Sequence, residues 1–342
     1  MSLIINLWHC MPYILISILC LTPLLANALT VYSYRHYESD QRLFELFTQK
    51  TGIPVQVVKA KADTLLERLK AEGMNSNADV LITSDASRLA AADRADLLQP
   101  VESPLLRERV PAHLRDPDNK WFGFTQRARV LVYHPDRVRP SELSTYEALA
   151  EPEWKGRLLV RSSSNVYNQS LMAAMIVANG PESALKWAQG LVSNMARPPQ
   201  GSDRDQMRAV AKGLADVAIV NTYYLGLLKN SSLSADRDVA EKLKIFFPNQ
   251  AGRGTHINIS GAGVTKSSRQ PEQAVQLLEF LVSAQAQATF PAATYEYSVL
   301  KDAPLSKLHA NWGAFKADSM PLSLLGENNV AAVKLLNKAG WR

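Results

Sequence analysis

Two parts of this chain alternate β-strand patterns with amphipathic helix patterns, and this alternation limits the possible folds more than any other feature. The first part has two helix patterns, one with Ser39 as its expected N-cap and Asp40 in its first turn, and one with Asp63 as its expected N-cap. The strands expected around them are LTVYSY (29–34), IPVQVV (53–58) and ADVLITSD (78–85). A β-α-β-α-β order favours a mostly parallel sheet with helices on both faces.

The alternation starts again in the second half of the chain. Strands are expected at 157–162 and 213–221, and a helix is expected to begin at Ser164 or Asn165. Between the halves lie two long extended segments, WFGFTQRARVLVYHP (121–135) and THINISGAGVTK (255–266). Two crossings between two α/β units predict two lobes joined by a pair of hinge strands. The fold class is therefore α/β and two-lobed, each lobe having a mixed, mostly parallel sheet flanked by helices.

These crossings also set the expected domain boundaries. We expect an N-lobe made of residues 29–128 and 260–304. The C-lobe is expected to contain residues 129–259 and 305–342.

The first 28 residues differ in kind from the rest. They contain no Lys, Arg, Asp or Glu, and they end in Ala26-Asn27-Ala28. An apolar segment followed by this A-x-A pattern predicts a signal peptide, cleaved after Ala28, and therefore export to the periplasm. Both cysteines, Cys10 and Cys20, lie inside it. The mature chain then has no disulfide, and a metal bound to it would need oxygen or nitrogen ligands.

The formal net charge of +6 is scattered over the mature chain. Nucleic-acid binding would require clustered Lys and Arg with aromatic residues between them, and the sequence shows no such cluster. We therefore expect no nucleic-acid partner.

Tyrosines gather where the predicted strands end. In open α/β sheets ligands bind beyond the carboxyl ends of the strands. Three of the four places expected there contain tyrosine: Tyr37 in the first loop, Tyr167 in the first turn of the helix that begins near residue 165, and the pair Tyr223-Tyr224 in NTYY. Side chains of neighbouring residues alternate within a strand, so both members of the pair can face one cleft only if the strand has already ended and a loop follows.

The chemistry of these side chains points to ferric iron. Phenolate is a hard anionic ligand that suits highly charged ions, and a trivalent metal can expel the phenol proton on binding. The six histidines show no zinc-like spacing, and no calcium loop is present. Four phenolates around Fe³⁺ sum to −1, and Arg35 and Arg127 are the candidates to offset that charge.

The chain resembles the periplasmic ferric-iron-binding proteins of bacterial ABC uptake systems, most closely their tyrosine-rich subgroup. The resemblance covers essentially the whole chain after Ala28. It rests on the segments LTVYSYRHYESD, ADVLITSD, WFGFTQRARVLVY, WKGRLLVRSSSNVYNQS, ARPPQGSDRDQMRAVAKGLADVAIVNTYYLG and HINISGAGVTKSS. It implies the type II periplasmic-binding-protein fold, with the iron site in the cleft between the lobes.

The resemblance also implies the roles of single residues. The metal ligands would be His36 and Tyr37 from the N-lobe, with Tyr167, Tyr223 and Tyr224 from the C-lobe. A carbonate held by Arg35 is the candidate synergistic anion. The protein would be a monomer that takes up Fe³⁺ or a ferric chelate and passes it to an inner-membrane ABC permease with its ATPase.

Two other functions are compatible with the sequence. The same scaffold could bind an organic or anionic solute such as a phosphonate, a polyamine or a sugar phosphate, with Arg35, Arg127 and Ser162–Ser164 holding the anion. An exported hydrolase is the other alternative. It lacks support, because the chain has no G-x-S-x-G motif and no cysteine after residue 20, so we expect that the protein is not an enzyme.

Overall fold

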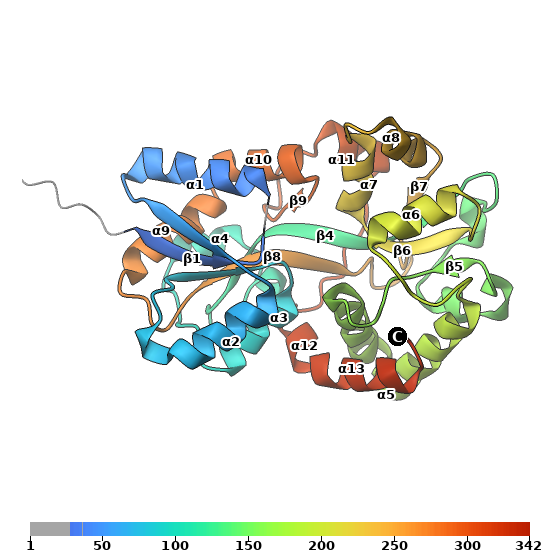
Figure 1. The fold of residues 1–342 in the computed structure, drawn as a ribbon, viewed down its shortest axis with the longest axis horizontal. Helices are drawn as coiled ribbons and strands as arrows, with labels where there is room; N and C mark the ends of the chain where they lie inside the picture. The colour runs from blue at the N-terminus through green and yellow to red at the C-terminus, as the bar shows by residue number, and fades with distance from the viewer. Residues whose placement is uncertain (1–27, 36) are drawn as a thin grey trace, which may run out of the picture.

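The computed structural model describes residues 28–35 and 37–342, which fold into two α/β lobes lying side by side (Figure 1). The hydrogen-bonded strands run in the order β2-β1-β3-β8-β4-β6-β5, and β7 and β9 also pair with β4. The strands are β1 (Leu29–Ser33), β2 (Val55–Lys59), β3 (Val80–Thr83), β4 (Phe122–Tyr133), β5 (Leu158–Leu159), β6 (Val217–Asn221), β7 (Lys244–Phe246), β8 (Ile257–Val264) and β9 (Tyr297–Ser298).

Two long antiparallel strands join the lobes, as the sequence predicted. β4 pairs with β8 and β9 through Ala128, and from Arg129 onward it pairs with β6 and β7. Because β4 changes partners at this point, it belongs to the sheets of both lobes. The parallel pairs β1–β2 and β1–β3 lie in one lobe, and β5–β6 lies in the other. The two-lobed α/β fold is thus confirmed, and the exact lobe boundaries stay a prediction.

Helices cover both faces of the sheet in each lobe (Figure 1). In the first lobe they are α1 (Glu38–Thr51), α2 (Ala62–Glu72), α3 (Ala86–Arg94), α4 (Pro104–Arg109), α9 (Pro271–Leu281) and α10 (Ala284–Thr294). The second lobe has α5 (Val166–Asn194), α6 (Asp203–Ala211), α7 (Thr222–Lys229), α8 (Ser234–Glu241) and α11 (Lys307–Trp312).

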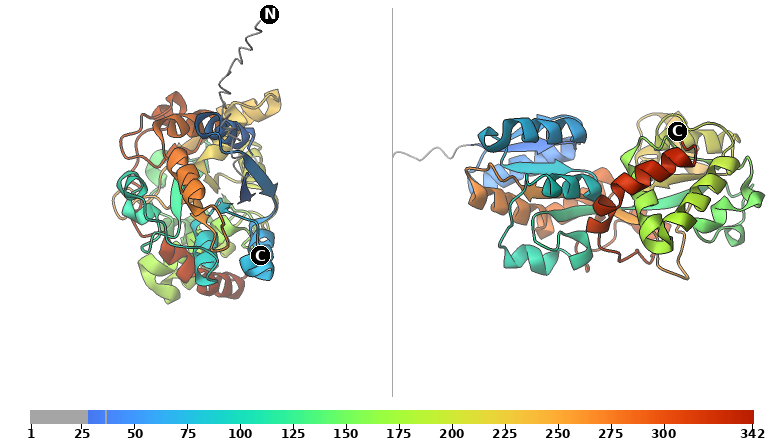
Figure 2. Two further views of the ribbon diagram at one scale, coloured as in Figure 1. Left: turned by 90° about the vertical axis from the view of Figure 1, so that its left-hand side faces the viewer. Right: turned by 90° about the horizontal axis from the view of Figure 1, so that it is seen from below.

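The last two helices run from the junction along the second lobe. These are α12 (Ser323–Glu327) and α13 (Asn329–Lys338), and the right-hand view of Figure 2 shows their course. Gly326 of α12 packs so tightly on α3 that an added Cβ would lie 2.3 Å from the Cβ of Ala90. The C-terminal segment therefore contacts the first lobe as well as the second.

Two predicted helix caps are wrong. α1 begins at Glu38 with Tyr37 as its N-cap, and α2 begins at Ala62 with Lys61 as its N-cap. Asp40 lies in the first turn of α1, as predicted, and Asp63 lies in the first turn of α2, and both form ion pairs. Asp40 pairs with Arg35 at 3.0 Å, and Asp63 pairs with Arg88 at 3.0 Å.

Candidate metal centre

Four tyrosines lie at the amino ends of three helices. Tyr37 follows β1 as the N-cap of α1, and Tyr167 lies in the first turn of α5. Tyr223 and Tyr224 lie in the first turn of α7, directly after β6. The loop predicted for this pair is wrong, because the chain passes from strand to helix without one. The first turn of a helix also leaves the strand geometry, so the pair escapes strand alternation.

The amino end of α5 is held by its own side chains, which fixes Tyr167. Asn165 caps the helix by accepting a hydrogen bond from the backbone N–H of Tyr167 at 3.0 Å, as expected of an N-cap asparagine. Gln169 donates to the carbonyl oxygens of Ser163 and Ser164 at 3.1 and 3.4 Å. The serine loop before α5 is thereby tied to the helix that follows it.

The C-lobe phenols touch one another. The hydroxyl oxygens of Tyr167 and Tyr223 are 3.2 Å apart. The rings of Tyr223 and Tyr224 lie with centroids 4.2 Å apart and an interplanar angle of 34°. Three phenols from α5 and α7 thus form one cluster, as the sequence predicted for a common cleft.

Tyr37 brings the N-lobe to this cluster. Burial raises the pKa of Tyr37 above 10, the buried Glu296 raises it further, and Arg35 lowers it, while Tyr167 also contributes to raising it. Burial likewise raises the pKa of Tyr223, with Tyr167, Tyr224 and Tyr37 adding to the effect. Phenols from the two lobes are therefore close enough to act on one another electrostatically. Near neutral pH, without a cation, Tyr37, Tyr223 and Tyr224 are neutral because burial raises the pKa of each.

Three guanidinium groups surround the ring of Tyr167. The Cζ atoms of Arg127, Arg161 and Arg129 lie 5.2, 5.8 and 6.0 Å from its centroid. Arg127 was predicted from the sequence to lie near the tyrosines, whereas Arg129 and Arg161 were not. Arg129 follows Arg127 by two residues in β4, so both project from one face of that strand, and this spacing was the available signal.

Carboxylates compensate the positive charges of these arginines to different degrees. Arg129 forms an ion pair with Asp203 at 2.6 Å. Arg127 is 2% exposed, and the carboxylate of its ion pair, Glu296, is farther away at 3.8 Å. Of these two cations, Arg127 is therefore the less fully compensated.

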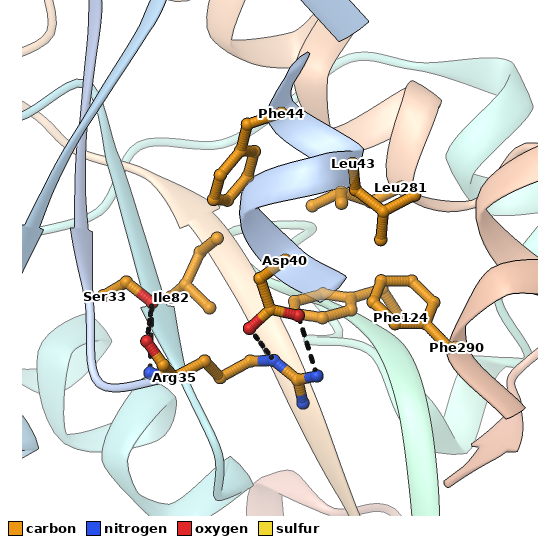
Figure 3. Close-up of a pocket in the computed structure, with 9 residues that line it drawn as sticks. All are labelled: Ser33, Arg35, Asp40, Leu43, Phe44, Ile82, Phe124, Leu281 and Phe290. Carbon is orange, nitrogen blue, oxygen red and sulfur yellow. Dashed lines mark hydrogen bonds and ion pairs between the residues drawn. The ribbon is translucent and has the colours of Figure 1, made fainter. Parts of the chain in front are cut away.

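Arg35 lies in a small pocket of the N-lobe between apolar side chains and Asp40 (Figure 3). Its Nε and Nη2 atoms donate to the two carboxylate oxygens of Asp40 at 3.0 and 3.1 Å, and Nη1 donates to Glu296 at 2.7 Å. Its Cζ atom also lies 4.9 Å from the ring centroid of Tyr37. Arg35 is thus next to a predicted ligand, as expected, but it is already paired with two carboxylates.

His36, the remaining predicted ligand, lies outside the described residues. Within residues 28–35 and 37–342, no group of three or more His, Cys, Asp and Glu side chains is arranged to hold a metal ion.

The two lobes contact each other beside these tyrosines. Asp85, the N-cap of α3, accepts hydrogen bonds from Ser170 of α5 at 2.9 and 3.0 Å and from Asn258 of β8 at 2.9 Å. One buried carboxylate thus joins both lobes and a hinge strand, an arrangement that the sequence analysis missed. The two lobes are therefore in direct contact at this point.

Two α/β lobes, two hinge strands and a polar cluster between the lobes define the class of type II periplasmic-binding proteins. The chain belongs to the family of bacterial extracellular solute-binding proteins, whose model matches residues 42–317. It is 52% identical to iron uptake protein A1 of a Synechocystis strain over 321 residues, which cover 94% of this chain and 89% of that protein.

Solved structures of iron-binding proteins are also similar to this chain. A Trichodesmium protein solved in complex with iron and citrate ligands is 49% identical, with a TM-score of 0.90, and the match covers 92% of this chain and all of that one. The ferric binding protein from Campylobacter jejuni is 44% identical, with a TM-score of 0.87 and the same coverage. The resemblance to ferric-iron-binding proteins that the sequence indicated is confirmed. Throughout the described part of the chain, no helix combines the length and apolar character needed to span a membrane.

Proposed function

We propose that this protein captures Fe³⁺ in the cleft between its lobes and delivers it to an ABC permease. The observation that carries this proposal is the contact between the hydroxyl oxygens of Tyr167 and Tyr223, 3.2 Å apart, with Tyr224 against Tyr223. Phenols that lie this close share one small volume, in which a single cation can reach all of them. Tyr37 supplies the N-lobe ligand, and His36 beside it is the second N-lobe candidate.

The charges around the tyrosines favour a trivalent ion. Burial and mutual repulsion oppose ionisation of several phenols together, and a strongly charged cation overcomes both effects. Four phenolates with Fe³⁺ carry a net charge of −1. Arg127, which lies 5.2 Å from the Tyr167 ring centroid, offsets it.

The names of the relatives support iron as the cargo. Iron uptake protein A1 and the major ferric iron-binding protein of Neisseria meningitidis are 52% and 30% identical to this chain. The Trichodesmium structure contains citrate together with iron, which favours a ferric chelate as one form in which the cargo arrives. Carbonate is the alternative anion.

The proposed cycle follows from ligands on both lobes. Iron stabilises the closed form because only that form brings Tyr37 to the C-lobe phenols. The closed monomer then docks in the periplasm on a permease with its ATPase. The protein binds and carries, and it performs no chemical reaction on the cargo.

A visible absorption titration tests the proposal. Ferric citrate is added near neutral pH to residues 29–342, and phenolate bound to Fe³⁺ is detected by its broad charge-transfer band. We expect the band to saturate at one iron per chain and to weaken in Tyr167→Phe. A protein that stays colourless would refute the iron proposal and favour an organic or anionic solute on the same scaffold.

A further inference from the structure

A buried glutamate lies where the chain leaves α10 for the junction of the lobes. Glu296 is 2% exposed. The residue before it, Tyr295, caps α10 in the left-handed conformation with φ 58°, which is unusual for a residue other than glycine. Such backbone is kept where its surroundings require it, often near functional sites. Here it turns Glu296 into the space between two arginines.

The Glu296 carboxylate connects these arginines. Its Oε2 atom lies 2.7 Å from Nη1 of Arg35, and its Oε1 atom lies 3.8 Å from Nη1 of Arg127. Ser260 of β8 forms hydrogen bonds with the same three side chains. Its hydroxyl accepts from Arg35 at 2.6 Å and from Arg127 at 3.5 Å, and it donates to Oε1 of Glu296 at 3.4 Å.

Each of these arginines lies against a different tyrosine of the candidate metal centre. Arg35 lies 4.9 Å from the ring centroid of Tyr37 in the N-lobe, and Arg127 lies 5.2 Å from that of Tyr167 in the C-lobe. Glu296 and Ser260 therefore contact the two arginines that lie against the proposed ligands of both lobes.

The same short segment also contacts the helix that carries the tyrosine pair. A Cβ added at Gly226 of α7 would lie 2.7 Å from the Cβ of Tyr295. Residues 295 and 296 thus touch α7 on one side and the two arginines on the other. The backbone at Tyr295, which positions Glu296, is therefore packed against α7, the helix that carries Tyr223 and Tyr224.

We propose that Glu296 and Ser260 form a clamp that positions Arg35 and Arg127 against Tyr37 and Tyr167, so that ligands of both lobes are presented to one ferric ion. The proposal rests on the proposed iron function and adds two positioning residues to it. Neither residue is expected to touch the metal.

The physical reason is that both arginines are buried cations. A buried ion is tolerated only when it is paired and hydrogen-bonded, and losing one partner leaves the other uncompensated. Arg35 keeps Asp40 if Glu296 is removed, but Arg127 has no closer carboxylate among its ion pairs. Arg127 would then be held by Ser260 and by the carbonyl oxygen of Ser84, and its position beside Tyr167 would be poorly fixed.

Two variants test the clamp. Glu296→Gln keeps the shape of the side chain and removes its charge, and Ser260→Ala removes the shared hydroxyl with no change of charge. We expect ferric affinity, measured by competition with citrate, to fall about 10-fold in Glu296→Gln, as for other residues that orient metal ligands. The fall should be about 3-fold in Ser260→Ala, where one neutral hydrogen-bonding group is lost. The charge-transfer maximum should shift in both variants.

Asp216→Asn is the matched control. Asp216 also joins two arginines, accepting from Arg137 at 2.8 Å and from Arg157 at 2.7 Å, away from the tyrosines. This variant should be less stable but keep the wild-type ferric affinity and absorption band, because its lost ion pairs do not contact the arginines beside the tyrosines. Wild-type affinity and an unshifted band in both clamp variants would overturn the proposal, as would tighter binding in Glu296→Gln. A wild-type protein with no band would instead overturn the iron proposal, and the clamp with it.

Discussion

Tyr167 and Tyr223 are 56 positions apart in the sequence, and their hydroxyl oxygens are 3.2 Å apart at the amino ends of α5 and α7. α7 begins directly after β6, whereas the loop of residues 160–165 separates α5 from β5. This contact makes several expectations testable.

Tyr223→Phe removes one proposed ligand oxygen and little else. We expect ferric affinity to fall at least about 100-fold, equivalent to ~2.7 kcal/mol, because the buried ring cannot replace a metal–oxygen bond. Competition with citrate measures this. Stability without iron should change little, because the neighbouring phenols remain.

Tyr297→Phe is the matched control for that change. Tyr297 is 6% exposed, and its hydroxyl is buried without a hydrogen-bond partner among the described residues. Removing this hydroxyl should leave iron binding intact, with equal or slightly higher stability. Equal losses of affinity in both variants would mean that the loss at Tyr223 reflects packing rather than coordination.

Ser170→Ala should favour opening of the lobes. It removes the hydroxyl that α5 donates to Asp85 across the junction at 2.9 and 3.0 Å. We expect a larger radius of gyration by X-ray scattering without iron, and a return to the compact form when iron is added. The affinity should fall by about 3- to 10-fold, since the net contribution of a typical intramolecular hydrogen bond is roughly 0.5–1.5 kcal/mol.

Ser87→Ala is the control for this change. It also removes a hydroxyl that donates to the carboxylate of Asp85, but it breaks no contact between the lobes. Ser87 donates to Asp85 at 2.6 Å, but both residues lie at the start of α3 in one lobe. This variant should keep the wild-type radius of gyration. If both serine variants opened the lobes equally, the contact across the junction would not be the cause.

Alkaline pH should destabilise the iron-free protein. Burial raises the pKa values of Tyr37, Tyr223 and Tyr224 above 10 in the folded state, while the unfolded value is ~10. Their contribution to stability is therefore complete below pH ~10 and is lost as pH rises through the folded-state values. The slope is at most about 1.4 kcal/mol per pH unit for each group.

Absorbance of ionised tyrosine, followed together with circular dichroism, measures this effect. We expect several phenols to ionise only as the fold is lost. Ionisation of every tyrosine near pH 10 with the fold intact would show that these phenols are not held neutral by burial.

Acid should destabilise the protein through His256. Burial lowers the pKa of this histidine to about 3, and the nearby Arg129, Arg253 and Arg127 add to the effect. The unfolded value is ~6.5, so the contribution of neutral His256 is complete above pH ~6.5 and is lost as pH falls toward 3. Urea unfolding at pH 7 and pH 5 should show a smaller pH dependence in His256→Gln. An unchanged dependence would contradict this role.

The sequence predicted the strands, the hinges and the four tyrosines because these depend on local patterns. Alternation of apolar residues marks β1, β3 and β6, and the tyrosines follow at the strand ends where ligands of open sheets bind. α7 was missed because NTYYLG contains a glycine and follows a strand without a spacer. Packing of Gly226 against Tyr295 and Leu308 favours a helix there, and that contact is invisible in the local sequence.

The surroundings of the tyrosines were harder to predict because they join distant segments. Arg35 and Glu296 are 261 positions apart, and Asp85 and Ser170 are 85 apart. No spacing rule relates such residues before the fold is known. Arg161 was missed for a similar reason, since the turn that brings it to the Tyr167 ring depends on the cap of α5.

The most direct test of the account is a resonance Raman spectrum of the iron-loaded protein, excited within its visible absorption band. Only vibrations of groups bonded to the metal gain intensity under this excitation. We predict strong phenolate ring vibrations that lose intensity in Tyr167→Phe and in Tyr223→Phe but not in Tyr297→Phe. A loaded protein whose spectrum contains no enhanced phenolate vibrations would contradict a tyrosinate iron centre.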